Sequence, residues 1–259
     1  MKSLHGKTAI VTGASRGIGR AIAGRLALDG AQVLLVARNA ADLDAECARL
    51  RSVGVTASSF CADLCEPDAA AALRGEFLRQ HRSVDILINC AGATRVGDFL
   101  EFGEAVWADG FALKFHAARR LCAAFWGDLC ASKGSVVNIV GTAARTPSMD
   151  YCLGGAVNAA LLAFTKALAQ RGIRDGVQVN AVNPGPVRTA RQAANIARVA
   201  AEHQLSTDAA VLELARQFGM SRIGEPEDIA ALVAFVVSPA ARWLQGSLID
   251  MDGGQTKSI

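Results

Sequence analysis

The sequence predicts an α/β fold with a doubly wound parallel sheet. Seven short apolar runs alternate along the chain with longer segments of helical pattern. The runs are continuously apolar and do not alternate with polar residues, which is typical of parallel strands covered on both faces. Their alternation with helices indicates right-handed βαβ units. We therefore expect strands at residues 8–13, 31–38, 55–63, 84–92, 134–141, 176–185 and 246–254.

The connecting segments carry helical patterns, of which the first three lie at residues 17–30, 41–54 and 67–81. Residues 189–219 form an Ala-rich, helical insertion after the sixth strand. Open α/β sheets bind ligands beyond the carboxyl ends of their strands. We therefore interpret residues 189–219 as a substrate lid, with a helix pair that only packs as the alternative.

Composition favours one soluble domain that spans residues 1–259. The net charge of +3 and the absence of a Lys/Arg block argue against nucleic acid. Seven Cys without a CxxC pair and four scattered His predict no metal site and reduced thiols, as in a cytoplasmic protein. The amino terminus lacks a signal-peptide pattern, and the apolar run at residues 229–237 is too short to span a membrane.

A glycine-rich loop, TGASRGIGRAIA, joins the first strand to the first helix. Glycines there permit a tight turn, close approach of a phosphate to the backbone, and close packing of helix on strand. The helix N-terminus offers free N–H groups and a positive dipole end to a pyrophosphate. We expect this loop to bind a dinucleotide through Gly13, Ser15, Arg16, Gly17, Ile18 and Gly19.

The end of the second strand indicates which dinucleotide is bound. An acidic residue there would accept hydrogen bonds from the ribose of NAD, but this strand ends in Arg38. Together with Arg16, Arg38 favours the 2′-phosphate of NADP through charge-assisted bonds, so NAD is the less favoured cofactor. The alternative is that both arginines only face solvent.

Three more motifs follow strands: CADL with Asp63, NCAG at residues 89–92, and NPGPVRT at residues 183–189. With the glycine-rich loop and the terminal DMDGG, the chain resembles the short-chain dehydrogenase/reductase family over nearly its whole length. The resemblance implies a Rossmann-type, seven-stranded parallel sheet in three layers. It also implies that CADL contacts the adenine, NCAG the adenosine ribose and NPGPVRT the nicotinamide, through Asp63, Leu64, Asn89, Ala91, Gly92, Pro184, Gly185, Val187 and Thr189.

The catalytic positions depart from the family pattern of Asn, Ser, Tyr and Lys. Aligning the helix NAALLAFTKALA without gaps places Asn158 at the Lys position and Gly154, four residues earlier, at the Tyr position. Gly141 then stands at the Ser position and Ala112 at the Asn position. We expect none of the four to perform the usual chemistry, although Asn158 still has an amide for the nicotinamide ribose.

Tyr151, the one Tyr of the chain, is the remaining candidate for a catalytic residue. A shifted alignment makes it the family Tyr, but that leaves the Lys missing. A phenol without a nearby lysine is a poor base and a usable hydrogen-bond donor. We expect Tyr151 at the rim of the cleft, with Gly154 in the family Tyr position. Lys114 and His116 follow Ala112 on one expected helix, and His116 is a weaker candidate.

Two functions follow from this interpretation. The first is an NADP-dependent oxidoreductase of atypical mechanism that acts on a carbonyl or alcohol of small size. The second is an NADP(H)-binding sensor or subunit without turnover. Three arginines of the insertion hint at an anionic group on the substrate, although Ala-rich helices also carry solvated arginines. They are Arg191, Arg198 and Arg216. We further expect a homo-oligomer, dimer or tetramer, as the family resemblance implies.

Overall fold

The computed structural model describes residues 3–257 of the chain and contains a seven-stranded, wholly parallel sheet. The strand order is β3-β2-β1-β4-β5-β6-β7, which confirms the predicted doubly wound fold. Each strand is shorter than its apolar run because the run continues into the turn that follows. The strands are β1 Thr8–Thr12, β2 Gln32–Ala37, β3 Ala57–Cys61, β4 Ile86–Asn89, β5 Ser135–Ile139, β6 Gln178–Pro184 and β7 Leu248–Met251.

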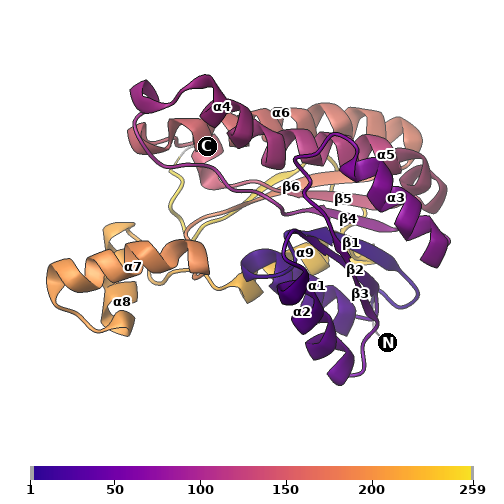
Figure 1. Ribbon diagram of the computed structural model, residues 1–259, viewed down its shortest axis with the longest axis horizontal. Helices are drawn as coiled ribbons and strands as arrows, with labels where there is room; N and C mark the ends of the chain where they lie inside the picture. Colours follow the sequence, from indigo (N-terminus) through magenta and orange to yellow (C-terminus); the bar gives the residue numbers. More distant parts are fainter. Residues whose placement is uncertain (1–2, 258–259) are drawn as a thin grey trace.

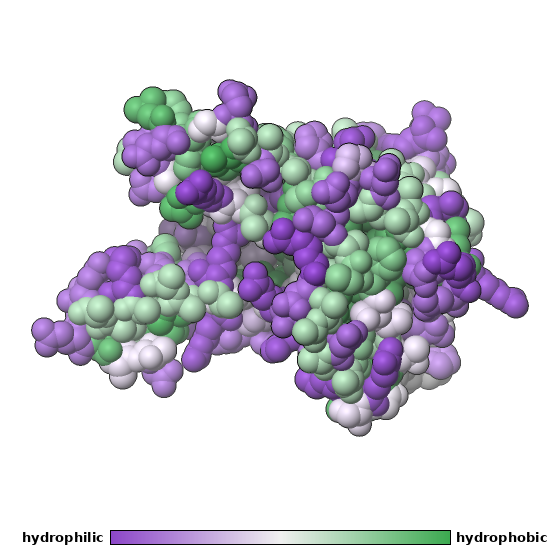
Figure 2. All heavy atoms as spheres, viewed as in Figure 1, coloured by the Kyte–Doolittle hydropathy of each residue, from purple (hydrophilic) through white to green (hydrophobic). Residues whose placement is uncertain are grey.

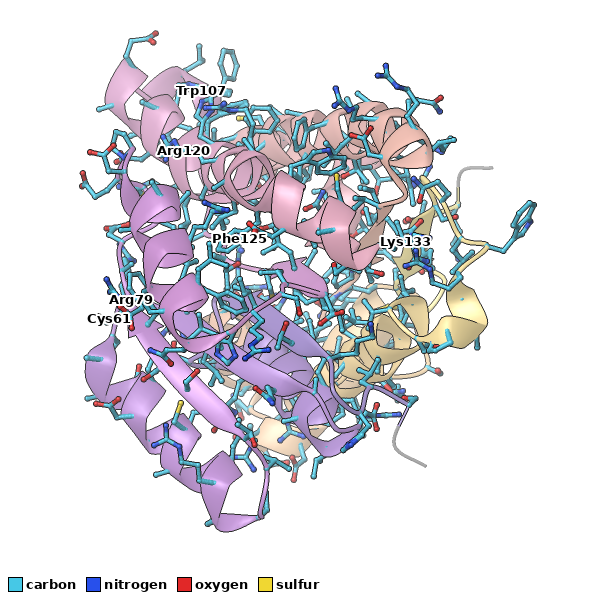
Figure 3. The ribbon with its side chains drawn as sticks, turned by 90° about the vertical axis from the view of Figure 1, so that its right-hand side faces the viewer. Cys61, Arg79, Trp107, Arg120, Phe125 and Lys133 are labelled. Carbon is cyan, nitrogen blue, oxygen red and sulfur yellow. The ribbon has the colours of Figure 1, made fainter. Side chains whose placement is uncertain are left out.

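Helices cover both faces of this sheet and complete the three layers (Figure 1). One face carries α1 (Gly17–Leu28), α2 (Ala40–Ser52) and α9 (Pro226–Val236). The other carries α3 (Ala69–Gln80), α4 (Glu104–Phe111), α5 (Ala117–Ser132) and α6 (Cys152–Asp175). Neighbouring residues of one strand serve opposite layers: Val11 packs with the first group and Ile10 with the second. Figure 3 shows Phe125 of α5 in the second layer, where it is fully buried.

The strand order reverses beside β1, which lies between β2 and β4. Thr12 ends β1 at this point, and its Oγ1 accepts hydrogen bonds of 3.0 Å from the backbone N–H groups of Cys90 and Ala91. The side chain therefore fixes the loop after β4 against the loop after β1. In open α/β sheets such a switch point forms the ligand crevice.

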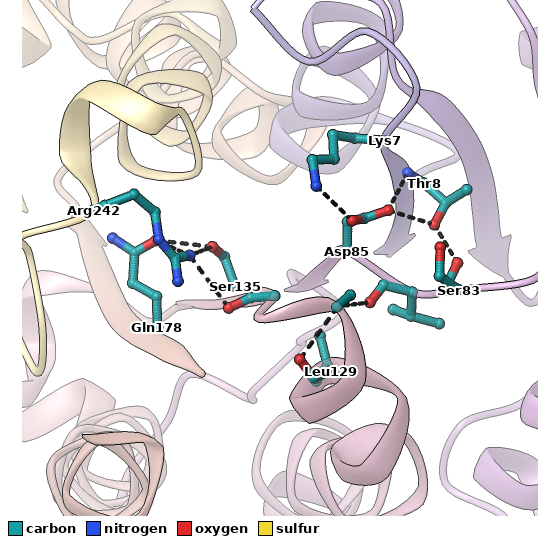
Figure 4. Close-up of polar contacts among 11 residues, drawn as sticks. Lys7, Thr8, Ser83, Asp85, Leu129, Ser135, Gln178 and Arg242 are labelled. Atoms are coloured by element: carbon teal, nitrogen blue, oxygen red, sulfur yellow. Dashed lines mark hydrogen bonds and ion pairs between the residues drawn. The ribbon is translucent and has the colours of Figure 1, made fainter. Parts of the chain in front are cut away.

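Polar contacts hold the opposite edge of the sheet, where the strands begin (Figure 4). Asp85, just before β4, accepts a 3.0 Å hydrogen bond from the Thr8 N–H and pairs with Lys7 at 2.8 Å. Ser135 donates to the Gln178 side chain at 2.8 Å and receives a 3.1 Å bond from Arg242. Charged and polar side chains thus join β1 to β4 and β5 to β6 at the edge remote from the crevice.

Residues 149–175, which include α6, are long and apolar enough to cross a membrane, but half of their most apolar stretch is buried inside the protein. Leu161 of α6 is buried, and Thr165 donates to its carbonyl at 2.7 Å and accepts from Asn138 of β5. These contacts identify α6 as a core helix that packs on the sheet.

A π-helical turn, Ala112–His116, interrupts the continuous helix formed by α4 and α5. This turn was not predicted, because one extra residue per turn hardly alters the apolar pattern. His116, the weaker catalytic candidate, is the last residue of this turn. It packs against Phe111 and Phe115, with ring centroids 6.4 and 5.2 Å away.

Two helices, α7 (Ala190–His203) and α8 (Thr207–Gln217), project from the body as an arm (Figure 1). The arm has its own apolar cluster, which includes Val199 and Leu214. Its two stems are paired: the Arg188 N–H donates to the Gly224 carbonyl at 2.8 Å, and the Gly224 N–H to Pro186 at 3.0 Å. Figure 2 shows the surface hollowed between this arm and the body. The predicted helical insertion is therefore present as two helices.

Candidate functional site

The glycine-rich loop forms a cradle at the switch point. Gly13 has a φ of +66°, and a Cβ on it would lie 3.0 Å from the Cα of Ala91. A Cβ on Gly19 would overlap the carbonyl of Gly13, so helix α1 can sit this close only with glycine there. Arg16, the N-cap of α1, makes no side-chain capping bond. The first N–H groups of α1 are therefore free of a side-chain cap and available to an anion.

A cavity of about 640 Å³ extends from this loop to the arm. Arg16, Gly17 and Arg20 line one side, and Thr189, Ala193 and Ile196 the other. Gly17 and Thr189 approach each other, since a Cβ on Gly17 would lie 3.3 Å from the Thr189 methyl. The loop after β6 thus meets the glycine-rich loop, as a shared cofactor site requires. In that loop the Gly185 N–H donates to Met251 at 3.1 Å.

Arg38 and Asp63 lie at the ends of the adjacent strands β2 and β3. Their side chains form a 3.5 Å ion pair and are 64% and 40% exposed. The Cys65 N–H donates to the Asp63 carboxylate at 2.9 Å; this bond, helped by the Arg38 charge, lowers the pKa of Asp63. Leu64 is buried behind them. The Arg38 guanidinium is therefore exposed to solvent and keeps donors for a ligand.

The NCAG segment contributes its backbone to the site, and its Asn side chain to the core. Asn89 donates to Asn138 at 2.8 Å, and Asn138 donates to Thr165 at 2.8 Å, all within the buried interior. Any contact of Asn89 with a cofactor is thereby left to its main chain. Ala91 and Gly92 follow at the crevice, where the Thr12 hydroxyl holds Ala91.

Three of the four expected catalytic positions come together beside the crevice. Gly154 and Asn158 are buried on one face of α6, four residues apart. Gly141 follows β5 with a φ of +150°, and a Cβ on it would lie 3.4 Å from the Asn158 Nδ2. The Asn158 Oδ1 is buried and has no hydrogen-bond partner among residues 3–257. Ala112 begins the π-helical turn. Their assignment to the family positions stays a prediction.

Tyr151 lies just before α6, and its ring covers Gly154. A Cβ on Gly154 would lie only 2.0 Å from the Tyr151 Cζ and so overlap that ring. The Tyr151 hydroxyl contacts the Thr94 hydroxyl and accepts a 2.6 Å hydrogen bond from Arg191 of α7. The Arg191 guanidinium carbon also lies 5.6 Å from the Tyr151 ring centroid. Tyr151 therefore connects the loop after β4 to the arm, a contact that sequence reasoning did not predict.

Lys114, in the π-helical turn, brings an ammonium group to the same edge. Its Nζ donates to the Val140 carbonyl at 2.6 Å, directly before Gly141. Burial lowers the pKa of Lys114 to about 8, and the nearby Arg191 charge adds to that effect. Burial also raises the pKa of the Cys90 thiol to about 12, so this neighbour is neutral. The sequence offered one signal for Lys114, its place two residues after Ala112.

Within residues 3–257 no cluster of His, Cys, Asp or Glu side chains is suited to hold a metal ion. The seven cysteines are free thiols. Cys152, with Ser148, lines a second hollow of about 500 Å³ that does not include the glycine-rich loop. The candidate site therefore consists of the glycine cradle, the α6 face and the residues around Lys114 and Tyr151.

Comparison with known proteins shows which family this chain belongs to. The sequence pattern of short chain dehydrogenases matches residues 7–199. An uncharacterized oxidoreductase of Mycobacterium tuberculosis is 34% identical over 258 residues, which cover 99% of this chain and 94% of the relative. The 3-oxoacyl-[acyl-carrier-protein] reductase of Vibrio cholerae serotype O1 is 32% identical over 97% of this chain and 98% of its own.

A solved structure agrees in fold along the entire length. The L-sorbose reductase of Gluconobacter frateurii, complexed with NADPH and L-sorbose, superposes with a TM-score of 0.95 at 28% identity and covers 100% of both chains. The switch-point crevice, the glycine cradle and these matches agree with one another. The chain belongs to the short-chain dehydrogenase family and is an oxidoreductase of that type.

Proposed function

We propose that the protein binds NADP(H) and interconverts a carbonyl and an alcohol on a small-molecule substrate. NADP(H), when bound, supplies or accepts the hydride, which is the cofactor's own chemistry. The single observation that carries the proposal is the cradle in which Gly13 and Gly19 leave no room for a Cβ beside the uncapped start of α1. The L-sorbose reductase that shares the fold was solved with NADPH, which supports the same choice here.

The residues present fit such a cofactor at both ends. Arg38 holds an exposed guanidinium at the end of β2, and Arg16 lies at the start of α1, so both can bind a 2′-phosphate. At the other end, Asn158 has a buried amide oxygen without a partner. Burying a polar atom unpaired costs about 1–3 kcal/mol, and a ribose hydroxyl at this position would relieve that cost.

The mechanism we propose differs from that of most family members. Glycine at 141 and 154 offers no hydroxyl, and Asn158 carries no charge. The chain must therefore move the proton through another group. The Thr94, Tyr151 and Arg191 cluster supplies hydrogen bonds at the mouth of the crevice, where it can orient a substrate.

We also propose that the α7–α8 arm is the substrate lid and that the protein assembles as a dimer or tetramer. The arm lines the cavity with Ala193 and Ile196 and reaches Tyr151 through Arg191. Exposed apolar side chains outside the site, such as Trp243 at 99% and Ile173 at 63%, are candidates for burial between subunits. Light scattering at micromolar concentration tests this assembly, and a monomer would contradict it.

The deciding experiment for the function is turnover. The purified protein is assayed with NADPH against ketoses, 3-oxoacyl thioesters and aromatic ketones, while fluorescence titration measures NADPH binding. Oxidation of NADPH that depends on one of these carbonyls supports the proposal. Tight NADPH binding without any turnover would refute it in favour of a sensor or subunit without activity.

A further inference from the structure

We propose that Lys114 is the proton donor of this site and takes over the part that a Tyr–Lys pair plays elsewhere in the family. The inference rests on the proposed function and names a residue for its unassigned step. Lys114 is a partly buried cation that no acidic side chain accompanies. Among the ion pairs of the described residues, none includes Lys114. The fold thus holds an ammonium where its charge is costly.

The position of Lys114 is fixed on three sides. The Nζ donates to the Val140 carbonyl at 2.6 Å, which places it at the carboxyl end of β5. The side-chain stem lies against Gly92, since a Cβ there would be 3.0 Å from the Lys114 Cδ. Gly92 is the last residue of the NCAG segment, and Val140 directly follows β5. Both segments lie beside the crevice. The π-helical turn gives Lys114 this direction, and such turns occur frequently at functional sites.

The carbonyl that accepts from Lys114 lies directly before one of the expected catalytic positions. Val140 precedes Gly141, where a Cβ would lie 3.4 Å from the Asn158 Nδ2, and the Asn158 Oδ1 has no hydrogen-bond partner among residues 3–257. In the expected alignment the family Lys falls at position 158, where this chain has a neutral amide. Lys114 returns a positive charge to the same edge of the sheet from a different helix. It does so where neither Gly141 nor Gly154 can supply a proton.

The electrostatic surroundings suit a donor. The titratable or charged groups that affect Lys114 are Arg191 at the start of α7 and Cys90 in the loop after β4. The guanidinium repels the ammonium, and the buried thiol stays neutral. Burial and Arg191 together lower the Lys114 pKa from 10.5 to about 8, so the proton is held less tightly than on an exposed lysine. General acids work best when their pKa lies near the working pH.

The Lys114 ammonium gives its proton to the carbonyl oxygen of the substrate while the carbonyl carbon accepts the hydride from NADPH. The π electrons of the C=O bond form the new O–H bond, and the products are the alcohol, NADP⁺ and a neutral Lys114 amine. The amine regains a proton from water. In the direction of alcohol oxidation the neutral amine accepts the proton.

Variants at position 114 test the assignment on a substrate that the unmodified protein reduces. Lys114→Met should lower kcat by about 10²–10⁴-fold, the usual contribution of a positioned general acid. Lys114→Arg keeps the charge and a donor for Val140 but cannot release its proton, so kcat should stay low. Ethylamine should restore part of the turnover of Lys114→Ala. NADPH affinity is measured for each variant by fluorescence titration, so that a loss of kcat is separated from a loss of cofactor binding.

The pH profile separates a donor from a structural lysine. In the reductive direction kcat should fall as pH rises through about 8, and Lys114→Met should lack this limb. Lys133→Asn is the matched control. Lys133 is exposed at the end of α5, remote from the crevice (Figure 3), and its left-handed backbone, with φ of 50°, suits Asn.

A measurement without turnover completes the test. Competitive acetylation, read by mass spectrometry over pH 6.5–10.5, should show Lys114 titrating below its ordinary pKa of 10.5 and protected by NADPH. The assignment is overturned if Lys114→Met keeps kcat within threefold, if Lys114→Arg restores it, or if NADPH leaves Lys114 labelling unchanged. An unmodified protein that reduces no carbonyl of the panel refutes the proposed function itself, which is a distinct result.

Discussion

The ring of Tyr151 fills the space into which any side chain at Gly154 would project. Position 154 is where the alignment puts the usual catalytic Tyr, so this chain keeps an aromatic ring beside that point but attaches it three residues earlier. The hydroxyl is consequently aimed at Thr94 and Arg191. Glycine at 154 and Tyr at 151 therefore depend on each other.

This dependence predicts a strong coupling in stability. Gly154→Ala should lower the free energy of unfolding by about 1–3 kcal/mol, because the new methyl group overlaps the ring. In a Tyr151→Ala background the same change should be neutral or favourable, since Ala is the better helix former by about 1 kcal/mol. Urea unfolding of the four proteins of this cycle gives the coupling energy.

The matched control is Gly75→Ala in α3, where a Cβ would meet nothing within 4 Å. It should stabilise the protein in either background by about 0.5–1 kcal/mol. A Gly154→Ala penalty that persists without the Tyr151 ring would show that the ring is not its cause.

Replacing the Tyr151 hydroxyl should have little effect on the rate. Tyr151→Phe removes the bonds to Thr94 and Arg191 but no proton donor, so kcat should stay within about tenfold, or ~1.4 kcal/mol. Steady-state kinetics, with NADPH binding measured in parallel, tests this. A loss of about 10²-fold or more with intact cofactor binding would make Tyr151 the donor, in place of Lys114.

Cofactor preference should depend on Arg38. Arg38→Asp replaces an exposed guanidinium next to Asp63 with a second carboxylate. Loss of one charge-assisted contact costs ~1.5–3 kcal/mol, so NADPH should bind about 10- to 150-fold more weakly, while NADH gains relative to it. Arg82→Asp makes the same charge change at an exposed site before β4 and should leave the ratio unchanged. Tighter binding of NADH than NADPH by the unmodified protein would contradict the role of Arg38.

The free energy of unfolding should also depend on the ionisation of Lys114. Its pKa is about 8 in the folded chain and 10.5 as its ordinary value, so the fold disfavours the charged form. Below about pH 8 Lys114 is charged in both the folded and the unfolded state, so the full free-energy cost of holding its charge in the fold is present. Between about pH 8 and 10.5 the unfolded state binds the additional proton, and stability therefore rises with pH. The stability advantage of Lys114→Met without cofactor should accordingly shrink over this window in urea unfolding. A difference that is constant from pH 7 to 10.5 would mean that Lys114 titrates as an exposed lysine.

The strands and the glycine cradle were predictable because each follows from a local pattern. Residues 31–38 form an unbroken apolar run, and the cradle glycines stand at fixed offsets after a strand. The arrangement around Gly154 was not predictable in this way. A ring that lies on a glycine is a contact through space, and the sequence shows only that both residues lie near the start of one helix.

Lys114 escaped prediction for a different reason. A lysine in a helical segment usually faces solvent, and the π-helical turn that holds it differs from an α-helix by a single residue per turn. The apolar pattern does not resolve that difference. Two of the residues that contact Lys114, Gly92 and Val140, lie far from it in the sequence.

The polar contacts of Lys7, Asp85, Ser135 and Arg242 hold the sheet at the edge opposite the crevice. The groups that keep the strands together are therefore not those that would touch a substrate. The reactive edge can therefore tolerate exchange of its side chains without loss of the folded sheet, since the contacts that join the strand starts do not depend on them.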